Sequence, residues 1–296
     1  EAPSWYEGAI VLEPKPGIYL DDPITVLDFT SLYPSSIIEM NLSPETFIGS
    51  MKYNEGNKSE KLINKSNIKY FKNFHEDNYN NITYNNYICK DNIDTNYPQI
   101  ECRFIKKHLV TKDNDTNVSD TKNNDTNLHV KPKSTLGIIP LVLGDLLNHR
   151  KKTKDLLKIE KDPTNKKILD GRQLAYKLTA NSIYGQLGAK TSPIYFKEIA
   201  ACTTAVGRMR IENAIKGATK WADKHAKPLK FDRNINVIYG DTDSIFVKFD
   251  MTIYDEDDKS IGKYKGDEAV TKSKEYGEDL QAFMSNTEGF LKDTKQ

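Results

Sequence analysis

The chain has 296 residues, of which 29% are charged and 37% hydrophobic, and this length allows one large or two small domains. Its formal net charge of +1 gives no global signal for a nucleic-acid partner, so any basic surface has to be local. Three cysteines without CxxC spacing argue against a disulfide framework or a zinc site, and no apolar run approaches the roughly 18 residues that span a bilayer.

The first residues lack both an initiating Met and a signal-peptide pattern, which predicts an internal piece of a longer polypeptide. Residues 9–12 and 24–29 read as short strands, separated by a turn-prone Pro-Lys-Pro-Gly run at 14–17. The second of these strands ends on Asp28, which an irregular turn follows. A lone aspartate at a strand end is more often a turn or cap residue than a ligand, so its meaning depends on its company.

From about Gly49 to Ser134 the composition shifts to Asn, Lys, Asp and Thr. Within this block, residues 112–127 form a polar near-repeat that cannot bury enough apolar surface to offset its ordering entropy, which predicts a disordered loop. The flanks 79–89 and 100–105 are candidates for a pair of strands. The block as a whole is interpreted as an elaboration and not as the chemical centre.

Helical spacing begins at Gly137 and leads into a basic run at 149–154. A turn is expected at 162–165, followed by a second helix over roughly 167–184, so the two helices form an antiparallel hairpin. A third helix is predicted for 199–222. An acidic loop at 255–258 and a mainly polar helix from about Asp267 complete the predicted elements.

The segment 239–244 (Tyr-Gly-Asp-Thr-Asp-Ser) places two carboxylates one residue apart inside an apolar, strand-like run. It predicts a tight hairpin with Asp241 and Asp243 at its tip and Gly240 easing the bend. Together with Asp28, this pair could hold two magnesium ions about 4 Å apart, as in phosphoryl transfer. Taken alone, the same six residues could form an ordinary polar turn.

The helical hairpin carries a polar face of three cations, an amide and an aromatic ring. On its second helix, Lys177, Asn181 and Tyr184 share a face, and on its first helix Arg150 and Lys154 are four residues apart. Such a set suits a triphosphate and a base, because phosphates attract Arg and Lys while an unstacked base packs on an aromatic ring. The alternative is a solvated basic face on a surface hairpin.

Three segments in order resemble motifs A, B and C of family B DNA polymerases: 28–35 (DFTSLYPS), 172–185 (RQLAYKLTANSIYG) and 239–244 (YGDTDS). Residues 6–9 (YEGA) resemble the short motif between that family's exonuclease and polymerase domains. The Asn- and Lys-rich insertion is most similar to polymerases of large cytoplasmic DNA viruses. No exonuclease carboxylate motifs precede Glu1, the family's Lys-rich Tyr motif is not recognisable after Lys248, and no thumb segment is recognisable.

The resemblance implies an α+β fold, in which an antiparallel palm sheet backed by helices carries an inserted α-helical fingers hairpin. Residues 1–48 would form the first part of the palm, 49–134 a polar and partly disordered insertion, and 135–189 the fingers. Residues 190–254 would form the second part of the palm, and 255–296 its end, leading toward the thumb.

The resemblance also implies roles for individual residues. Asp28 and Asp243 would hold two Mg²⁺ ions, for which Mn²⁺ could substitute, with the Phe29 carbonyl as a further ligand, and Lys177 would take part in catalysis. Nucleotide binding would involve Ser31, Leu32, Tyr33, Arg150, Lys154, Lys177, Asn181 and Tyr184, where Tyr33 excludes a 2′-hydroxyl and the amides near Ser31 and Leu32 meet the triphosphate. DNA contacts would involve Tyr6, Gly8, Gly185, Tyr239, Asp241 and Thr242, with Asp241 supporting and Gly185 leaving room for the template backbone.

The resulting hypothesis is a replicative DNA-directed DNA polymerase that transfers dNMP from a dNTP to a primer 3′-hydroxyl by a two-metal mechanism. Its partners would be primer-template DNA, dNTPs and a sliding clamp or other processivity factor, with no membrane. It would act inside the cell, in the host cytoplasm (virus factory) or nucleus if viral. Two alternatives stay open: a polymerase that uses ribonucleotides or an RNA template, and a catalytically incomplete fragment that only binds DNA or nucleotides.

Overall fold

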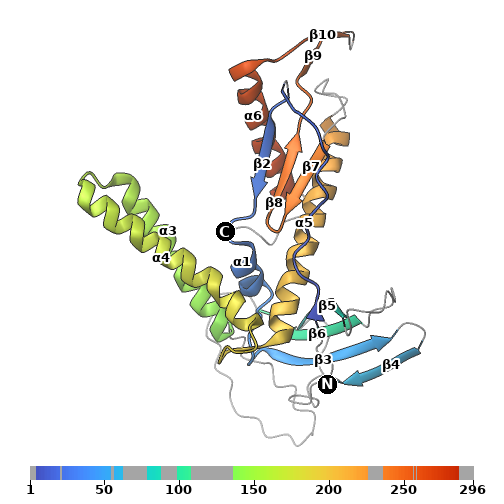
Figure 1. Cartoon of the computed structure of the whole chain (residues 1–296), viewed down its shortest axis with the longest axis vertical. Coiled ribbons are helices and arrows are strands. Elements are labelled where there is room, and N and C mark those ends of the chain that lie inside the picture. The colour runs from blue at the N-terminus through green and yellow to red at the C-terminus, as the bar shows by residue number, and fades with distance from the viewer. Residues whose placement is uncertain are drawn as a thin grey trace, which may run out of the picture.

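The structure is a computed structural model that describes residues 5–20, 22–54, 57–62, 79–87, 99–107, 136–225, 236–255, 257 and 259–286. Helices and antiparallel sheets occur together in these ranges, so the predicted α+β class is confirmed. The long helix α5 (Lys197–His225) runs from a three-stranded sheet at one end of the molecule to a five-stranded sheet at the other (Figure 1).

The three-stranded sheet has the order β2-β8-β7 and is antiparallel throughout. It consists of β2 (Ile24–Asp28), β7 (Asn236–Asp241) and β8 (Ser244–Lys248). One face of this sheet buries apolar side chains of β8 against α5 and α6 (Gly266–Asn286). A separate two-stranded ribbon, β9 (Thr252–Tyr254) with β10 (Ser260–Lys263), precedes α6.

The predicted strand at 24–29 and the predicted hairpin at 239–244 are confirmed by β2 and by the β7–β8 pair. The prediction that Gly240 eases the bend is wrong, because Gly240 lies within β7 and the left-handed residue of the turn is Thr242. The predicted strand at 9–12 is wrong, because only an isolated bridge joins Val11 to Asp241. The Leu12 amide donates to the Gly240 carbonyl as part of this bridge, and one further bond, from the Lys15 amide to the Ile238 carbonyl, ties the segment to β7 at the sheet edge. Proline has no backbone N–H and fixes its φ, so the two prolines that follow prevent a regular ladder.

The five-stranded sheet has the order β1-β5-β6-β3-β4 and is also antiparallel. Its strands are β1 (Trp5–Tyr6), β3 (Phe47–Asn54), β4 (Asn57–Leu62), β5 (Tyr79–Tyr87) and β6 (Gln99–Ile105). Buried side chains of β5 and β6, including Ile82, Cys102 and Phe104, join one core with the first half of α5.

This sheet changes the interpretation of the polar block that begins near Gly49. The pairing of its two flanks is confirmed by β5 and β6, but β3 and β4 were not foreseen. The described part of the block is also no mere elaboration, since it supplies a share of the core. In the middle of β5, Asn81, Thr83 and Asn85 alternate with the buried Ile82 and Tyr84, and such an alternation is enough for a strand with one buried face. The near-repeat at 112–127 lies outside the described residues.

Two antiparallel helices, α3 (Ile138–Ile159) and α4 (Pro163–Gly188), form the predicted hairpin, which projects from the body (Figure 1). The second helix begins four residues earlier than expected. Asp162 is its N-cap, where the carboxylate accepts the Asn165 amide at 2.8 Å, and proline fits the first helical position because its missing N–H is not needed there. The predicted turn is therefore mostly the start of α4.

Asn41 ties the root of this hairpin to the five-stranded sheet. Its side chain donates to the Ile105 carbonyl at the end of β6 (2.9 Å) and accepts the Gly137 amide at the start of α3 (2.8 Å). The residue is fully buried and has a left-handed φ of 53°. The amide of Ile138 donates to the Glu45 carboxylate, so the first turn of α3 has an acceptor from outside the helix.

Helix α5 belongs to two cores. Its first half packs with α1 (Leu32–Glu39), the α3–α4 hairpin and the five-stranded sheet, through residues such as Ile199 and Val206. Its second half packs on the three-stranded sheet and α6, through residues such as Ile211 and Trp221. The junction between the two cores lies where β2 ends and α1 begins.

Candidate active site

Asp28 and Asp243 come from distant parts of the sequence and lie side by side at this junction. Strands β2 and β8 pair in register, with Asp28 opposite Ser244. The ladder continues past the strand ends, because the Phe29 amide donates to the Asp243 carbonyl at 2.8 Å. Thr242, at the tip of the β7–β8 hairpin, has a left-handed φ of 53°. The structure therefore brings together the two carboxylates that the sequence predicted as metal ligands.

The electrostatics of Asp243 report the same proximity. Burial raises the pKa of Asp243 above its ordinary value of 3.8, and the negative charges of Asp28 and Asp241 raise it further. Lys177, on α4, acts in the opposite direction on the pKa of this carboxyl. The region around Asp28, Asp241 and Asp243 is thus rich in negative charge, and a cation bound there would relieve the repulsion between the carboxylates.

The donor set fits a magnesium ion that completes its shell with other ligands. Within the described ranges, no group of three or more His, Cys, Asp or Glu side chains could enclose a metal. Magnesium is commonly bound by one or two carboxylates together with water and substrate phosphates, and not by an all-protein cage. Two adjacent carboxylates meet that requirement.

Asp241 has a different environment from the other two aspartates. The Thr242 hydroxyl donates to its Oδ1 at 2.8 Å, and the Tyr239 hydroxyl lies 3.5 Å from its Oδ2. Both carboxylate oxygens therefore have partners within the hairpin tip. These three residues, predicted to contact DNA, form one group beside Asp243, in which Asp241 is exposed and the other two are partly buried.

The turn after Asp28 is held in an uncommon backbone conformation. Ser31, the N-cap of α1, has φ 54° and ψ 55°, which is the left-handed region. The hydroxyl of Ser35 donates to the Ser31 carbonyl at 2.7 Å and holds this turn. No side chain caps the first turn of α1, so the amides around Leu32 and Tyr33 have the unsatisfied character of a helix N-terminus.

Tyr33, Tyr184 and Tyr6 form a tyrosine cluster between the turn, α4 and β1. The rings of Tyr33 and Tyr184 are 4.4 Å apart between centroids, at 45°. Tyr184 also shares a side-chain hydrogen bond with Tyr6. Burial raises the pKa of both Tyr33 and Tyr184. All three residues were predicted as site residues, and the structure brings them together.

Two residues of α5 that the sequence analysis missed fix the segment after Tyr6. Arg208 donates to the carbonyls of Glu7 (2.8 Å) and Gly8, and its guanidinium forms an ion pair with the Glu7 carboxylate at 3.3 Å. The Thr204 hydroxyl donates to the same Glu7 carbonyl at 2.8 Å. The available signal was their spacing of four residues, which puts both side chains on one helical face.

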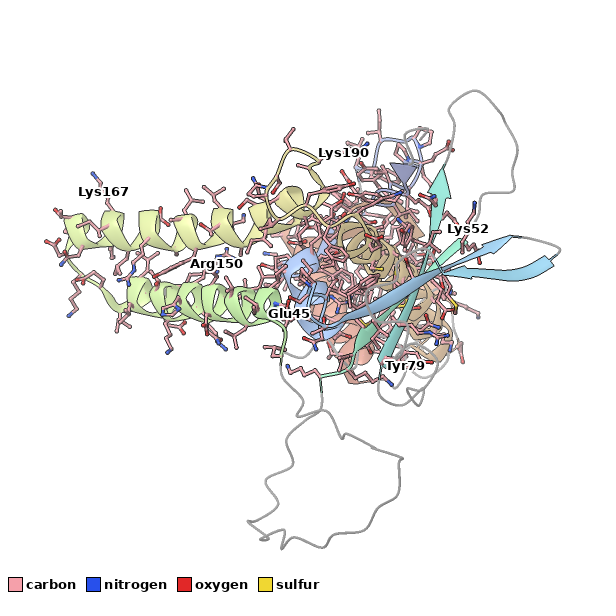
Figure 2. All side chains as sticks on the ribbon, turned by 90° about the horizontal axis from the view of Figure 1, so that it is seen from below. Glu45, Lys52, Tyr79, Arg150, Lys167 and Lys190 are labelled. Atoms are coloured by element: carbon pink, nitrogen blue, oxygen red, sulfur yellow. The ribbon has the colours of Figure 1, made fainter. Side chains whose placement is uncertain are left out.

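The cations of the α3–α4 hairpin are only partly gathered at the carboxylates. Lys177 reaches Asp243 electrostatically, whereas Arg150 lies between the two helices and donates to Gln173 at 3.4 Å (Figure 2). Because the helices are antiparallel, Arg150 and Lys154 lie farther toward the hairpin tip than Lys177. Asn181 is exposed on the same face of α4 as Lys177.

Gly185 and Gly8 both face open space. A Cβ atom built on either glycine would meet no atom within 4 Å. Gly185 lies on the exposed surface of α4, within the helix and not at its end as the sequence suggested. The room beside both glycines is therefore available to a ligand.

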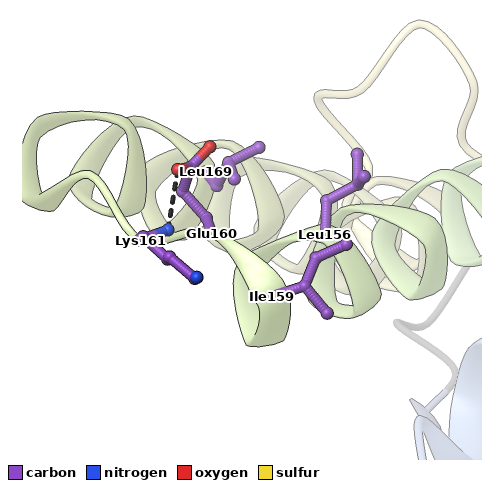
Figure 3. A pocket seen from close by; sticks show the side chains of 5 residues that line it. All are labelled: Leu156, Ile159, Glu160, Lys161 and Leu169. Carbon is purple, nitrogen blue, oxygen red and sulfur yellow. Dashed lines mark hydrogen bonds between the residues drawn. The ribbon is translucent and has the colours of Figure 1, made fainter.

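A hollow of about 470 Å³ lies at the turn of the α3–α4 hairpin, away from the carboxylates (Figure 3). Its lining is formed by Leu156, Ile159, Glu160, Lys161 and Leu169. The Glu160 carboxylate accepts the Lys161 amide at 2.8 Å and so closes the turn. None of the predicted site residues lines this hollow.

No helix in the described part of the chain combines the length and the apolar character required to cross a membrane.

Comparison with known proteins gives consistent similarities. A sequence profile of DNA polymerase family B matches residues 1–272. The DNA polymerase of Phaeocystis pouchetii virus is 38% identical over 251 residues, which covers 83% of this chain and 22% of the viral protein. The DNA polymerase of Pyramimonas orientalis virus is 34% identical over 273 residues, covering 82% and 20%.

The DNA polymerase delta catalytic subunit of Drosophila melanogaster is 34% identical over 244 residues, covering 82% of this chain and 17% of that subunit. The chain thus spans about a fifth of the length of these relatives. The resemblance predicted from the three motifs, including the resemblance to viral polymerases, is confirmed.

Proposed function

Because this chain belongs to DNA polymerase family B, we propose that it is the palm and fingers portion of a DNA-directed DNA polymerase. The reaction is template-directed transfer of dNMP from a dNTP to a primer 3′-hydroxyl, with release of pyrophosphate. In this assignment the α3–α4 hairpin belongs to the fingers (135–189). The palm consists of residues 1–48 and 190–254, and residues 255–296 lead toward the thumb.

The observation that carries the proposal is the adjacency of Asp28 and Asp243, together with the positive charge of Lys177, which acts on the Asp243 carboxylate. Phosphoryl transfer needs little covalent chemistry from the protein, so catalysis consists mainly of positioning and neutralisation of charge. Two carboxylates beside a lysine provide for both tasks. A surface turn would not require two distant strands to bring their acidic ends together.

Asp28, Asp243 and the Phe29 carbonyl would hold two Mg²⁺ ions, or Mn²⁺ in their place. When bound, such ions lower the pKa of an attacking hydroxyl and stabilise the charge on the transferred phosphate. Lys177 balances the carboxylate charge from the side of α4 and directs its ammonium group to the phosphates. Thr242 and Tyr239 hold Asp241 in its supporting position.

The nucleotide would lie between the turn after Asp28 and the α3–α4 hairpin. The amides around Ser31 and Leu32 donate to the triphosphate, since a helix N-terminus attracts anions. Arg150 and Lys154 neutralise the triphosphate when the hairpin bends inward. Arg150 depends on this movement, because its side chain contacts Gln173 in the structure. Tyr33 lies under the sugar, where it excludes a 2′-hydroxyl.

The remaining contacts of the site concern the base pair and the DNA. Asn181 and Tyr184 shape the pocket for the nascent base pair. Template and primer would contact Gly185 and the hairpin tip at 239–242, as well as Tyr6 and Gly8, which Arg208 fixes through the Glu7 segment. Primer-template DNA, dNTPs and a sliding clamp are the partners of the whole protein, which would work in the cytoplasm or nucleus of a host cell.

Primer extension by the intact protein tests the proposal. Asp243→Ala is expected to reduce dNTP incorporation at least a thousandfold, because Asp241, the other carboxylate of the hairpin tip, is held by Thr242 and Tyr239 and cannot replace it. Glu278→Gln, on the exposed surface of α6, is the matched control and should extend as the wild type does. Incorporation near the wild-type level by Asp243→Ala would show that the metal assignment is wrong.

The same assay separates the alternatives. A binding module without turnover would bind dNTP with Ca²⁺ but show no extension with Mg²⁺. A ribonucleotide polymerase would incorporate NTPs and dNTPs equally well.

A further inference from the structure

The ring of Tyr33 is held directly against the backbone of helix α5 at Gly207. A Cβ atom on Gly207 would lie 3.1 Å from Tyr33 Cε1 and 3.4 Å from Leu32 Cδ2. Carbon atoms in ordinary contact are about 3.5–4.0 Å apart, so the first distance is too short for a relaxed packing. The ring also contacts Tyr184 of α4, and is therefore bounded by two helices.

The conformation of α5 does not itself require a glycine at position 207. Gly207 has no positive φ and lies inside a 29-residue helix, where glycine costs about 1 kcal/mol relative to alanine. What the missing side chain permits is the close approach of Tyr33. By contrast, Gly171 on α4 has nothing within 4 Å of its Cβ position.

A second glycine bounds the tyrosine cluster on its other side. A Cβ on Gly188 would lie 2.8 Å from the Tyr6 hydroxyl, and Tyr6 is hydrogen-bonded to Tyr184. The cluster of Tyr6, Tyr184 and Tyr33 is thus packed between α4 at Gly188 and α5 at Gly207. A displaced Tyr33 ring cannot be accommodated by a shift of Tyr184, because Tyr184 is itself held through Tyr6.

We propose that Gly207 is a positioning residue for sugar selection, because it sets the depth at which the Tyr33 ring lies. This inference rests on the proposed function, in which Tyr33 meets the sugar of the incoming nucleotide. With Gly207, the ring lies back against α5 and leaves room for a deoxyribose. A methyl group at position 207 pushes the ring by a few tenths of an ångström toward the sugar, so that even a deoxyribose fits poorly.

Single-nucleotide extension by the intact protein tests the inference. The variants are Gly207→Ala, Tyr33→Ala and the double variant, and each is assayed with a dNTP and the matching NTP. Gly207→Ala is expected to raise KM for the dNTP about five- to tenfold with little change in kcat, which corresponds to a modest overpacking cost. In the Tyr33→Ala background the same substitution is expected to change KM less than about twofold, because the ring it displaces is gone.

Gly171→Ala is the control for adding a methyl group to a helix, and its KM should equal that of the wild type. A KM change of equal size with and without the Tyr33 ring would overturn the inference, as would no change in either background. If Gly207→Ala fails to fold and Tyr33→Ala does not restore folding, the inference also fails, since the obstruction then lies elsewhere.

The proposed function has a separate readout in the same experiment. Tyr33→Ala alone is expected to lose most of the preference for dNTP over NTP. If Tyr33→Ala keeps that preference, the role of Tyr33 is wrong, whatever Gly207→Ala does.

Discussion

Left-handed backbone at two non-glycine residues frames the carboxylate pair. Ser31 follows Asp28 by three positions, and Thr242 directly precedes Asp243. For a β-branched residue such as Thr242 this conformation is an outlier that costs on the order of 1 kcal/mol or more. Strain of this kind persists where the surrounding structure enforces the conformation. Here the two strained residues determine the points at which Asp28 and Asp243 leave their strands.

The raised pKa of Asp243 predicts a pH effect in the absence of divalent cations. The folded protein holds this proton more tightly than the unfolded chain, so the contribution of Asp243 to stability falls as pH rises from 3.8 through the raised folded value. Asp243→Asn removes this contribution. The free energy of unfolding of Asp243→Asn, relative to the wild type, is therefore expected to increase with pH over that window.

Denaturant unfolding in EDTA between pH 4 and pH 7 measures this difference. Glu278→Gln serves again as the control, and its difference from the wild type should not vary with pH over the same range. A pH-independent difference for Asp243→Asn would contradict the burial and repulsion described above.

At the scale of single elements, α4 offers a substitution that separates stability from activity. Gly185→Ala adds a methyl group where no protein atom lies within 4 Å, and alanine is favoured over glycine inside a helix by about 1 kcal/mol. The variant is therefore expected to melt at a higher temperature than the wild type. Its affinity for primer-template DNA is expected to fall, because the methyl group occupies the room proposed for the template backbone.

Gly171→Ala, on the same helix and equally open, should gain stability without losing DNA affinity. Thermal melting together with a titration of labelled duplex distinguishes the two variants. Equal DNA affinity for Gly185→Ala and the wild type would place the template elsewhere.

The first turn of α3 is capped by Glu45, a residue distant in the sequence, and this contact predicts a loss of stability when it is removed. The Glu45 carboxylate accepts the Ile138 amide and lies at the foot of α3 (Figure 2), where it also meets the positive end of the helix dipole. Glu45→Ala is expected to lower the free energy of unfolding by about 1 kcal/mol. Glu278→Ala, an exposed carboxylate within α6, should have a much smaller effect in the same denaturant titration.

Elements with a local sequence signal were predicted well, and those that depend on distant partners were not. The spacing of the leucines and the Asp-Pro pair at 162–163 indicate the helical hairpin, but Pro163 is the first residue of α4 and not part of a turn. Strand β4 was missed because its sequence is polar, and β3 because its apolar residues Phe47, Ile48 and Met51 do not alternate regularly. Both strands depend on pairing in a larger sheet.

The same limit applies to the site. The aspartates were recognisable because carboxylates in an apolar strand run need a partner. Arg208 and Thr204 were not, because their partner is a backbone carbonyl about 200 positions earlier, and their spacing of four residues in α5 gives a shared face but not that partner.

At the scale of the whole molecule, α5 couples the two cores. One helix without interruption packs against both sheets, so we expect the two cores to unfold cooperatively. Phe104→Ala, in the core farther from Trp221, is expected to lower the free energy of unfolding by about 3–5 kcal/mol. Hydrogen exchange should become faster in β8 and α6 as well as in β6.

Leu280→Ala, in the other core, is the matched variant and should accelerate exchange in β6 and α1. Exchange that changes only on the mutated side would show two independent domains and would contradict the coupling through α5.

The side-chain amide of Asn41 allows the connection between β6 and α3 to vary in length. One side chain holds the last carbonyl of β6 and the first amide before α3, so the two ends of the intervening stretch are fixed by the body of the protein and not by the stretch itself. An insertion or a deletion in that stretch would leave both anchor points in place. The length of that connection can therefore change without displacing β6, α3 or the junction at which Asp28 and Asp243 lie.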